Sequence, residues 1–174
     1  MDRTTKLIAA AERLFDRHGY VATGMDRLTR AAGMSSRTLY KHAGSKDALM
    51  ARVLGARDRR FLRRLEVSRV DALFTALADW LRVEGARGCF FLRARAETGG
   101  DVPEIAEAVA AHKAAYRARI QAVVTAELGR EDEALAEQVL VLLEGATHAA
   151  VYRGAEAVEA ARAAAAVLVE RARA

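Results

Sequence analysis

The chain has 174 residues, of which 52% are apolar and 29% charged, and its formal net charge is +5. That length and composition suit one compact domain, or two small ones, with a buried core. Cys89 is the single cysteine, which excludes a disulfide or a cysteine-based metal site within one chain. No apolar run approaches the length of a membrane span, and the first residues lack the apolar region of a signal peptide, so we expect a cytoplasmic protein.

Charge is distributed unevenly along the sequence. Residues 1–64 contain 15 Lys and Arg against 6 Asp and Glu, a balance of +9, whereas residues 65–174 have a balance of −4. Such a division indicates a small basic module that meets a polyanion, joined to a mildly acidic body with another task. The alternative is that the arginines only solvate helix faces.

Helical signals dominate the chain, because Ala, Leu, Arg and Glu are abundant and alternating strand patterns are lacking. In the N-terminal part the expected boundaries are a first helix ending at Gly19, a second from Thr23-Gly24 to Gly33, a third capped by Ser35 or Ser36 and ending near Gly44, and a fourth capped by Ser45 and ending near Leu65.

The C-terminal part has the same character. The expected elements are a helix over about 70–84, an apolar segment at 89–92, a long helix over about 103–128 that starts at Pro103, and two more at about 132–152 and 155–172. With nine helices expected in all, the sequence predicts an all-α fold.

The second and third helices, joined at Gly33, have the pattern of a helix-turn-helix, whose second helix lies in the DNA major groove. Leu28 and Ala32 can pack against Leu39, Gly33 permits a left-handed turn, and Met34 fills the corner. The outward positions are then polar or basic: Ser36, Arg37, Thr38, Lys41 and His42. Such short helix pairs are common, but the basic balance of this segment favours DNA as the partner.

At these residues the sequence resembles a known family. The stretch from Tyr20 to Leu49, YVATGMDRLTRAAGMSSRTLYKHAGSKDAL, is similar to the N-terminal signature of the tetracycline-repressor (TetR) family of bacterial transcription regulators. The similarity covers about residues 4–54. The later helices agree in number and order with the family's ligand-binding and dimerising domain, and the run Arg87-Gly-Cys-Phe-Phe-Leu92 is similar to a segment seen in part of the family.

The resemblance implies a helix-turn-helix DNA-binding domain at residues 1–48 and a helical effector-binding and dimerisation domain at residues 49–174. It implies that Thr23 and Lys46 hold phosphates at helix N-termini, that Tyr40 and His42 brace the DNA backbone, and that base edges are read by Ser36, Arg37, Thr38 and Lys41, with Arg37 suited to guanine. Ser35 and Thr23 have a structural alternative, because either can be only a helix cap.

One position departs from the family pattern. Ala43 stands where a phenylalanine is usual, and a Phe→Ala loss in a core costs about 3–5 kcal/mol when nothing repacks. We expect Met34 or Met50 to fill the volume, since flexible Met side chains adapt to irregular space. Gly24 is a smaller departure, where a Thr or Ser is common.

The body contains large and polarisable residues on apolar helices. The effector-binding candidates are Trp80, Phe90, Phe91, His112, Tyr116 and His148. They either line a cavity for a small apolar or aromatic effector, with the histidines as its orienting groups, or they are ordinary core residues whose histidines are satisfied by neighbours. Cys89 is expected to be a buried small apolar residue rather than a redox sensor.

Small residues recur at helical spacing in the last two helices. The two rows are Ala136, Leu140, Leu143, Ala146 and Ala150, and then Ala157, Ala161, Ala164 and Leu168. Two such helix pairs can close a four-helix interface about a two-fold axis, which predicts a homodimer. The alternative is that these residues pack inside one chain.

Taken together, the sequence predicts a sequence-specific transcriptional regulator, a repressor released from operator DNA by a small molecule. No cofactor, metal or membrane is expected. An enzyme that uses Cys89, His112 and Glu97 is a second hypothesis, but no spacing brings these residues together and no glycine-rich phosphate loop is present. A non-specific DNA coater, the third, leaves the body unexplained.

Overall fold

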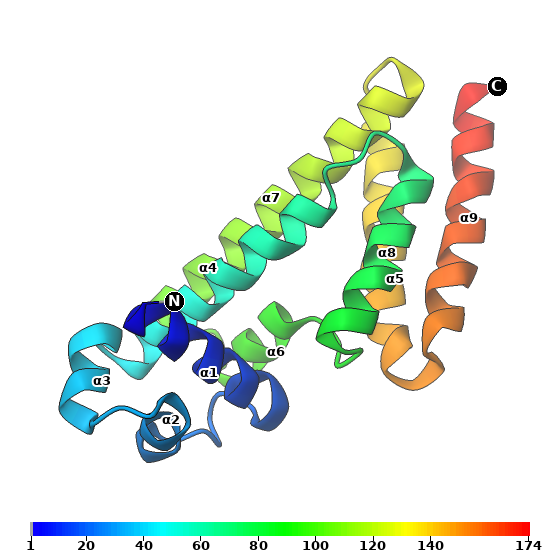
Figure 1. The fold of residues 1–174 in the computed structure, drawn as a ribbon. Helices are drawn as coiled ribbons and strands as arrows, with labels where there is room; N and C mark the ends of the chain where they lie inside the picture. Colours follow the sequence, from blue (N-terminus) through cyan, green and yellow to red (C-terminus); the bar gives the residue numbers. More distant parts are fainter. Residues whose placement is uncertain (1) are drawn as a thin grey trace. The chain divides into compact units, whose positions relative to one another are not determined.

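The computed structural model describes residues 2–174. Over these residues it has nine α-helices and no strand, which confirms the all-α class. They are α1 Arg3–His18, α2 Met25–Ala32, α3 Ser36–Ala43, α4 Lys46–Arg64, α5 Val70–Glu84, α6 Phe90–Glu97, α7 Pro103–Leu128, α8 Glu133–Arg153 and α9 Ala155–Arg173 (Figure 1). The apolar segment expected at 89–92 opens the short helix α6.

The chain divides into two compact units. The first unit is Met1–Arg59 together with Phe90–His112, and the second is Arg60–Cys89 together with Lys113–Ala174. These units are not two consecutive stretches of sequence, because α6 and the first part of α7 join the N-terminal helices. The first three helices therefore do not form a compact unit by themselves.

Helices α1, α2 and α3 pack on one another through one apolar face each. Leu7, Phe15, Leu28 and Leu39 are almost fully buried, and the rings of Phe15 and Tyr20 lie 5.6 Å apart between centroids. Asp2 caps α1, since its carboxylate accepts a hydrogen bond from the Thr5 amide at 2.7 Å. The amphipathic spacing thus turns the polar faces of these short helices outward.

Ala43 is 3% exposed, so this position is part of the core as expected. Met50 is fully buried in the same unit, whereas Met34 is half-buried. A buried Met50 agrees with the idea that a methionine occupies the volume of the usual phenylalanine, which stays a prediction.

The second unit has one apolar core. Helix α5 packs on both α8 and α9, and these two pack on each other (Figure 1). The core includes Phe74, Trp80, Tyr116, Val139 and Leu143. Helix α8 begins at a capping aspartate, Asp132, which accepts from the Leu135 amide at 3.0 Å.

The structure corrects one of the two small-residue rows. On α8, Ala136, Leu143, Ala146 and Ala150 are at most 4% exposed and pack inside their own chain. Because they already face α5 and α9, they are not available to a second copy. The α9 row is only half-buried at Ala157, Ala161 and Leu168, and Ala164 is exposed.

Helix α8 is also long and apolar enough to cross a membrane, judged by length and composition alone. This differs from the expectation that no segment reaches that length. One third of the apolar window is buried inside the chain, and core helices commonly have this composition. Helix α8 is apolar on two sides, because it has a buried row of small residues and leucine and also exposed apolar side chains such as Val141 and Tyr152.

Gly33 follows the last residue of α2, and its backbone lies in the left-handed region with φ +63°. A Cβ there meets no neighbour within 4 Å, so the cost of Gly33→Ala is backbone strain alone. We expect this variant to lose about 1–2 kcal/mol of unfolding free energy in urea titrations. Gly55→Ala is the matched control, because Gly55 lies inside α4 and a Cβ there would make only ordinary contact with the Arg59 side chain. This variant should gain about 0.5–1 kcal/mol of unfolding free energy. Equal effects of both would contradict the turn geometry.

Candidate nucleic-acid interface

Two short helices and the turn between them form the centre of the site. The Gly33 amide bonds back to Arg30 at 3.2 Å and the Met34 amide to Thr29 at 3.1 Å, which closes the C-terminus of α2. Ser35 then caps α3, its hydroxyl accepting from the Thr38 amide at 3.2 Å. Of the two serines proposed as the cap, the structure selects Ser35. These bonds fix where α3 starts and therefore which of its side chains face out.

The outer face of α3 is polar and basic. Ser36, Arg37 and Lys41 are exposed and have no hydrogen-bond or ion-pair partner among residues 2–174, and Thr38 is half-buried. Leu39 and Ala43 take the inward positions. A helix that keeps long cationic side chains free on one face suits contact with base edges and phosphates.

Tyr40 and His42 flank this face. Tyr40 is 51% exposed. His42 is half-buried, its Nδ1 lies 3.2 Å from the Thr4 hydroxyl on α1, and its carbonyl accepts a bond from Arg52 on α4. His42 therefore joins three helices, which is a structural task in addition to the expected contact with the DNA backbone.

The Thr23 side chain cannot contact a phosphate directly in this conformation. Its side chain is fully buried, and its hydroxyl donates to the Gly19 carbonyl at 2.7 Å. Gly24 rather than Thr23 is the N-cap of α2. Thr23 thus anchors the loop between α1 and α2, which leaves the backbone amides at the start of α2 as the groups able to face a phosphate.

Lys46 stands at the first position of α4, as expected, but its ammonium is engaged. Nζ lies 3.4 Å from the Val21 carbonyl and 4.2 Å from the centre of the Tyr20 ring. Partial burial lowers the pKa of Lys46, against the opposing effects of Asp47 and Glu97. Contact with a phosphate would require this side chain to leave Val21.

A clamp from α6 holds the loop between α1 and α2 in place. Arg93 bonds the carboxylate of Asp16 at 2.5 Å and the carbonyl of the same residue at 3.0 Å. One turn later on α6, Glu97 accepts the Val21 amide at 2.9 Å. Gly19 leaves room for this carboxylate, since a Cβ there would lie 2.8 Å from Glu97 Oε2.

A second ion pair fixes α1 to α4. Arg57 donates to Glu12 at 3.0 Å, and its guanidinium stacks near the Phe90 ring at 5.0 Å. Both Glu12 and Arg57 are largely buried. Sequence reasoning did not single out Glu12, Asp16, Arg57 or Arg93 as positioning residues. The only local signal was the four-residue spacing of Arg93 and Glu97, and their partners lie more than 70 positions away.

The six effector candidates are divided between the units. In the first unit, the Phe91 and His112 rings stack at 3.6 Å with 4° between planes, and His112 Nδ1 lies 2.7 Å from Asp58 Oδ1. Phe90 is buried in the same unit. His112 therefore has the partners of a satisfied core histidine.

In the second unit, Trp80 and Tyr116 both contact Phe61, with ring centroids 5.2 and 5.1 Å away. His148 is exposed on α8 and its Nδ1 lies 3.0 Å from the Glu144 carbonyl. Cys89 is 8% exposed, which agrees with a buried small apolar residue. For these side chains the structure gives packing roles, and an effector cavity remains a proposal.

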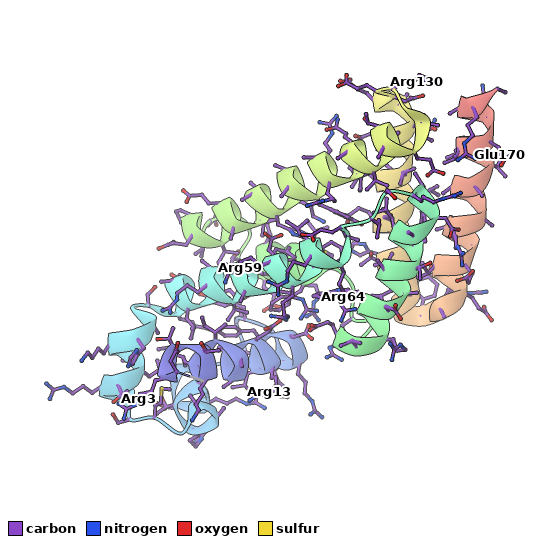
Figure 2. The ribbon with its side chains drawn as sticks, turned by 45° about the horizontal axis from the view of Figure 1, so that its top comes forward. Arg3, Arg13, Arg59, Arg64, Arg130 and Glu170 are labelled. Carbon is purple, nitrogen blue, oxygen red and sulfur yellow. The ribbon has the colours of Figure 1, made fainter. Side chains whose placement is uncertain are left out.

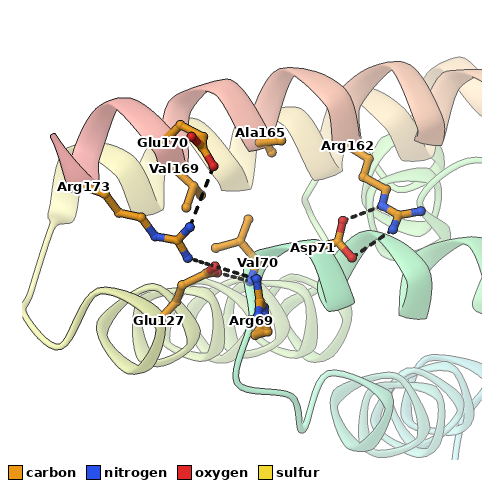
Figure 3. Close-up of a pocket in the computed structure, with 10 residues that line it drawn as sticks. Arg69, Val70, Asp71, Glu127, Arg162, Ala165, Val169, Glu170 and Arg173 are labelled. Atoms are coloured by element: carbon orange, nitrogen blue, oxygen red, sulfur yellow. Dashed lines mark hydrogen bonds and ion pairs between the residues drawn. The ribbon is translucent and has the colours of Figure 1, made fainter.

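One hollow of the second unit has several charged side chains in its lining. It measures about 170 Å³ and lies between α5, α7 and α9 (Figure 3). Arg162 forms a two-bond pair with Asp71, and Glu127 receives Arg173 at 2.7 Å and the Val70 amide at 2.6 Å. The hydrogen bond from Arg162 lowers the pKa of Asp71. Because these opposite charges pair with one another, we interpret the hollow as the place of an ion-pair network that joins α5, α7 and α9.

Comparison with known proteins agrees with this geometry. The family described as bacterial regulatory proteins, tetR family, matches residues 7–53, which run from α1 into α4. Two uncharacterized HTH-type transcriptional regulators of Mycobacterium tuberculosis are 29% identical over 120 residues, which is 64% of this chain and 59% of each relative.

Solved structures share the whole fold. A TetR-family transcriptional regulator from Streptomyces coelicolor has a TM-score of 0.89 at 24% identity, covering 99% of this chain and 96% of the other. A TetR transcriptional regulator from Legionella pneumophila has a TM-score of 0.80 at 16% identity, with 97% of both chains covered.

The N-terminal helices thus form a helix-turn-helix. Over residues 7–53 the chain has the N-terminal domain of the tetR family of bacterial regulatory proteins, and its whole fold is similar to that of solved TetR-family structures. These matches favour a transcriptional regulator over the enzyme considered above.

Proposed function

We propose that this protein is a cytoplasmic homodimeric repressor that binds operator DNA through α3 and is released by a small molecule. The observation that carries the proposal is the outer face of α3, where Ser36, Arg37 and Lys41 stand free on a helix whose start and orientation are fixed by Ser35 and Gly33. Side chains without a structural task on such a helix suit base readout.

Reading an operator requires two such helices. In dimeric helix-turn-helix proteins the two recognition helices enter successive major grooves about 34–36 Å apart. An effector that binds better to a body in which the two helices are wrongly spaced must weaken DNA binding, by linkage. Release by a small molecule is therefore the regulation that this two-part chain suits best.

An exposed apolar face on α8 and α9 supports the homodimer. On α8 its residues follow each other at steps of four, three and four, and on α9 small residues surround one valine. The α8–α9 face consists of Val141, Gly145, His148 and Tyr152 together with Ala160, Ala163, Ala164 and Val167. Val141, Tyr152 and Val167 are 62%, 79% and 68% exposed, which is unusual for apolar side chains that meet only water.

Point changes on α3 and α4 should separate base readout from general affinity. The probe is the DNA flanking the chain's own gene, titrated in gel shifts beside a random duplex of equal length. Arg37→Ala should lose about 1–3 kcal/mol on the preferred sequence and little on the random duplex. Lys46→Ala should weaken both equally and reduce the salt slope by about 1. Equal affinity of both variants and the wild type for both duplexes would remove the basis of the proposal.

Charge placed on the α8–α9 face should prevent dimer formation. Val141→Arg and Val167→Arg each put a guanidinium into an interface that would have to bury it, so sedimentation equilibrium should show monomers at concentrations where the wild type is a dimer. Val83→Arg is the matched control, because Val83 is a 56% exposed valine on α5 outside this face. A wild-type monomer, or dimers in both face variants, would show that this surface has another role.

A further inference from the structure

The exposed side of α1 is basic along its whole length. Arg3, Lys6, Arg13 and Arg17 are all exposed, and none has an ion-pair or hydrogen-bond partner within residues 2–174. At about 100° of rotation per residue, Lys6, Arg13 and Arg17 fall within about 40° of one another, and Arg3 lies beside them. We call these four residues the α1 stripe; it extends over about 21 Å at 1.5 Å per residue.

The acidic residues of α1 do not interrupt this stripe. The side chains of Glu12 and Asp16 are largely buried, and Arg57 and Arg93 pair with them at 3.0 and 2.5 Å. Asp16 is 6% exposed. The two ion pairs that hold α1 thus also remove negative charge from the surface and leave four cations that have no ion-pair partner among residues 2–174.

Both ends of the stripe are attached to the helix-turn-helix. At its start the Thr4 hydroxyl lies 3.2 Å from His42, in the last turn of α3, close in sequence to Lys41. At its end His18 Nε2 lies 2.8 Å from Arg27 on α2. Partial desolvation and the charges of Arg27 and Arg17 lower the pKa of His18, as expected inside a positive potential. The stripe therefore lies next to the helix-turn-helix formed by α2 and α3 (Arg3 and Arg13 are labelled in Figure 2).

We infer that the α1 stripe is a second contact surface for duplex DNA, which binds phosphates outside the groove entered by α3. This inference rests on the proposed function. Four cations over about 21 Å match a run of about six base pairs at 3.4 Å per pair, and each neutralised phosphate releases counterions. The contact carries no base information, so it lengthens the footprint and raises affinity for all sequences.

The test is the salt dependence of binding to a fluorescent 40-base-pair duplex of random sequence. Arg13→Gln/Arg17→Gln removes two charges per chain and retains helix propensity. The slope of log K against log salt should become shallower by about 2 per bound chain, at about 0.9 per phosphate. Arg82→Gln/Arg119→Gln, which removes the same charge from the second unit, should retain the wild-type slope. Thermal unfolding of both variants shows whether the fold is intact.

The outcomes separate the inference from the proposed function. A stripe variant with the wild-type slope, while Arg37→Ala still loses sequence preference, overturns the stripe and leaves the function standing. A wild type that binds no duplex overturns the function itself. Vesicles containing phosphatidylserine are the competing probe: stripe-dependent binding to them, with an unchanged DNA slope, would assign these cations to a membrane surface.

Discussion

Two ion pairs, the buried pair of Arg57 with Glu12 and the partly buried pair of Arg93 with Asp16, are the contacts on which the arrangement of α1, α2 and α3 depends. A charge taken out of water must be paired, and removal of one partner from a buried pair costs about 3–5 kcal/mol. Each pair joins α1 to a helix distant in sequence, α4 or α6, so the three N-terminal helices are held from outside. Glu97 adds a third attachment at the Val21 amide. The position of α3 therefore depends on contacts among five helices, α1, α2, α3, α4 and α6.

The same ion pairs connect packing with electrostatics. Because α4 and α6 supply the arginines that pair with Glu12 and Asp16, the exposed charged residues of α1 and α3 are all basic, while α2 adds one exposed carboxylate at Asp26. A positive surface of this kind attracts duplex DNA before any base is read. Any movement of α6 would act directly on Asp16 and Val21, because Arg93 and Glu97 are bonded to them.

Local physics made much of this structure predictable. Helix ends followed from Gly19, Ser35 and Pro103, and the left-handed turn followed from Gly33, because these signals act over a few residues. The outward face of α3 could be predicted because Leu39 must be buried, which turns the polar residues of the helix toward solvent. Burial of Thr23, the inward row on α8 and the clamp of Arg93 and Glu97 did not follow, since each depends on which distant helix packs against the segment. Periodicity shows that a face is apolar and leaves open what covers it.

Helix α6 holds the end of α1 and the loop that follows it, through Arg93 and Glu97. Hydrogen exchange of wild type and Arg93→Gln/Glu97→Gln, followed by mass spectrometry, tests this most directly, because the double change leaves the net charge unaltered. We expect faster amide exchange over residues 16–24, including the Val21 amide that loses its acceptor, with unchanged exchange in α8 and α9. Protection of residues 16–24 equal to that of the wild type would contradict it.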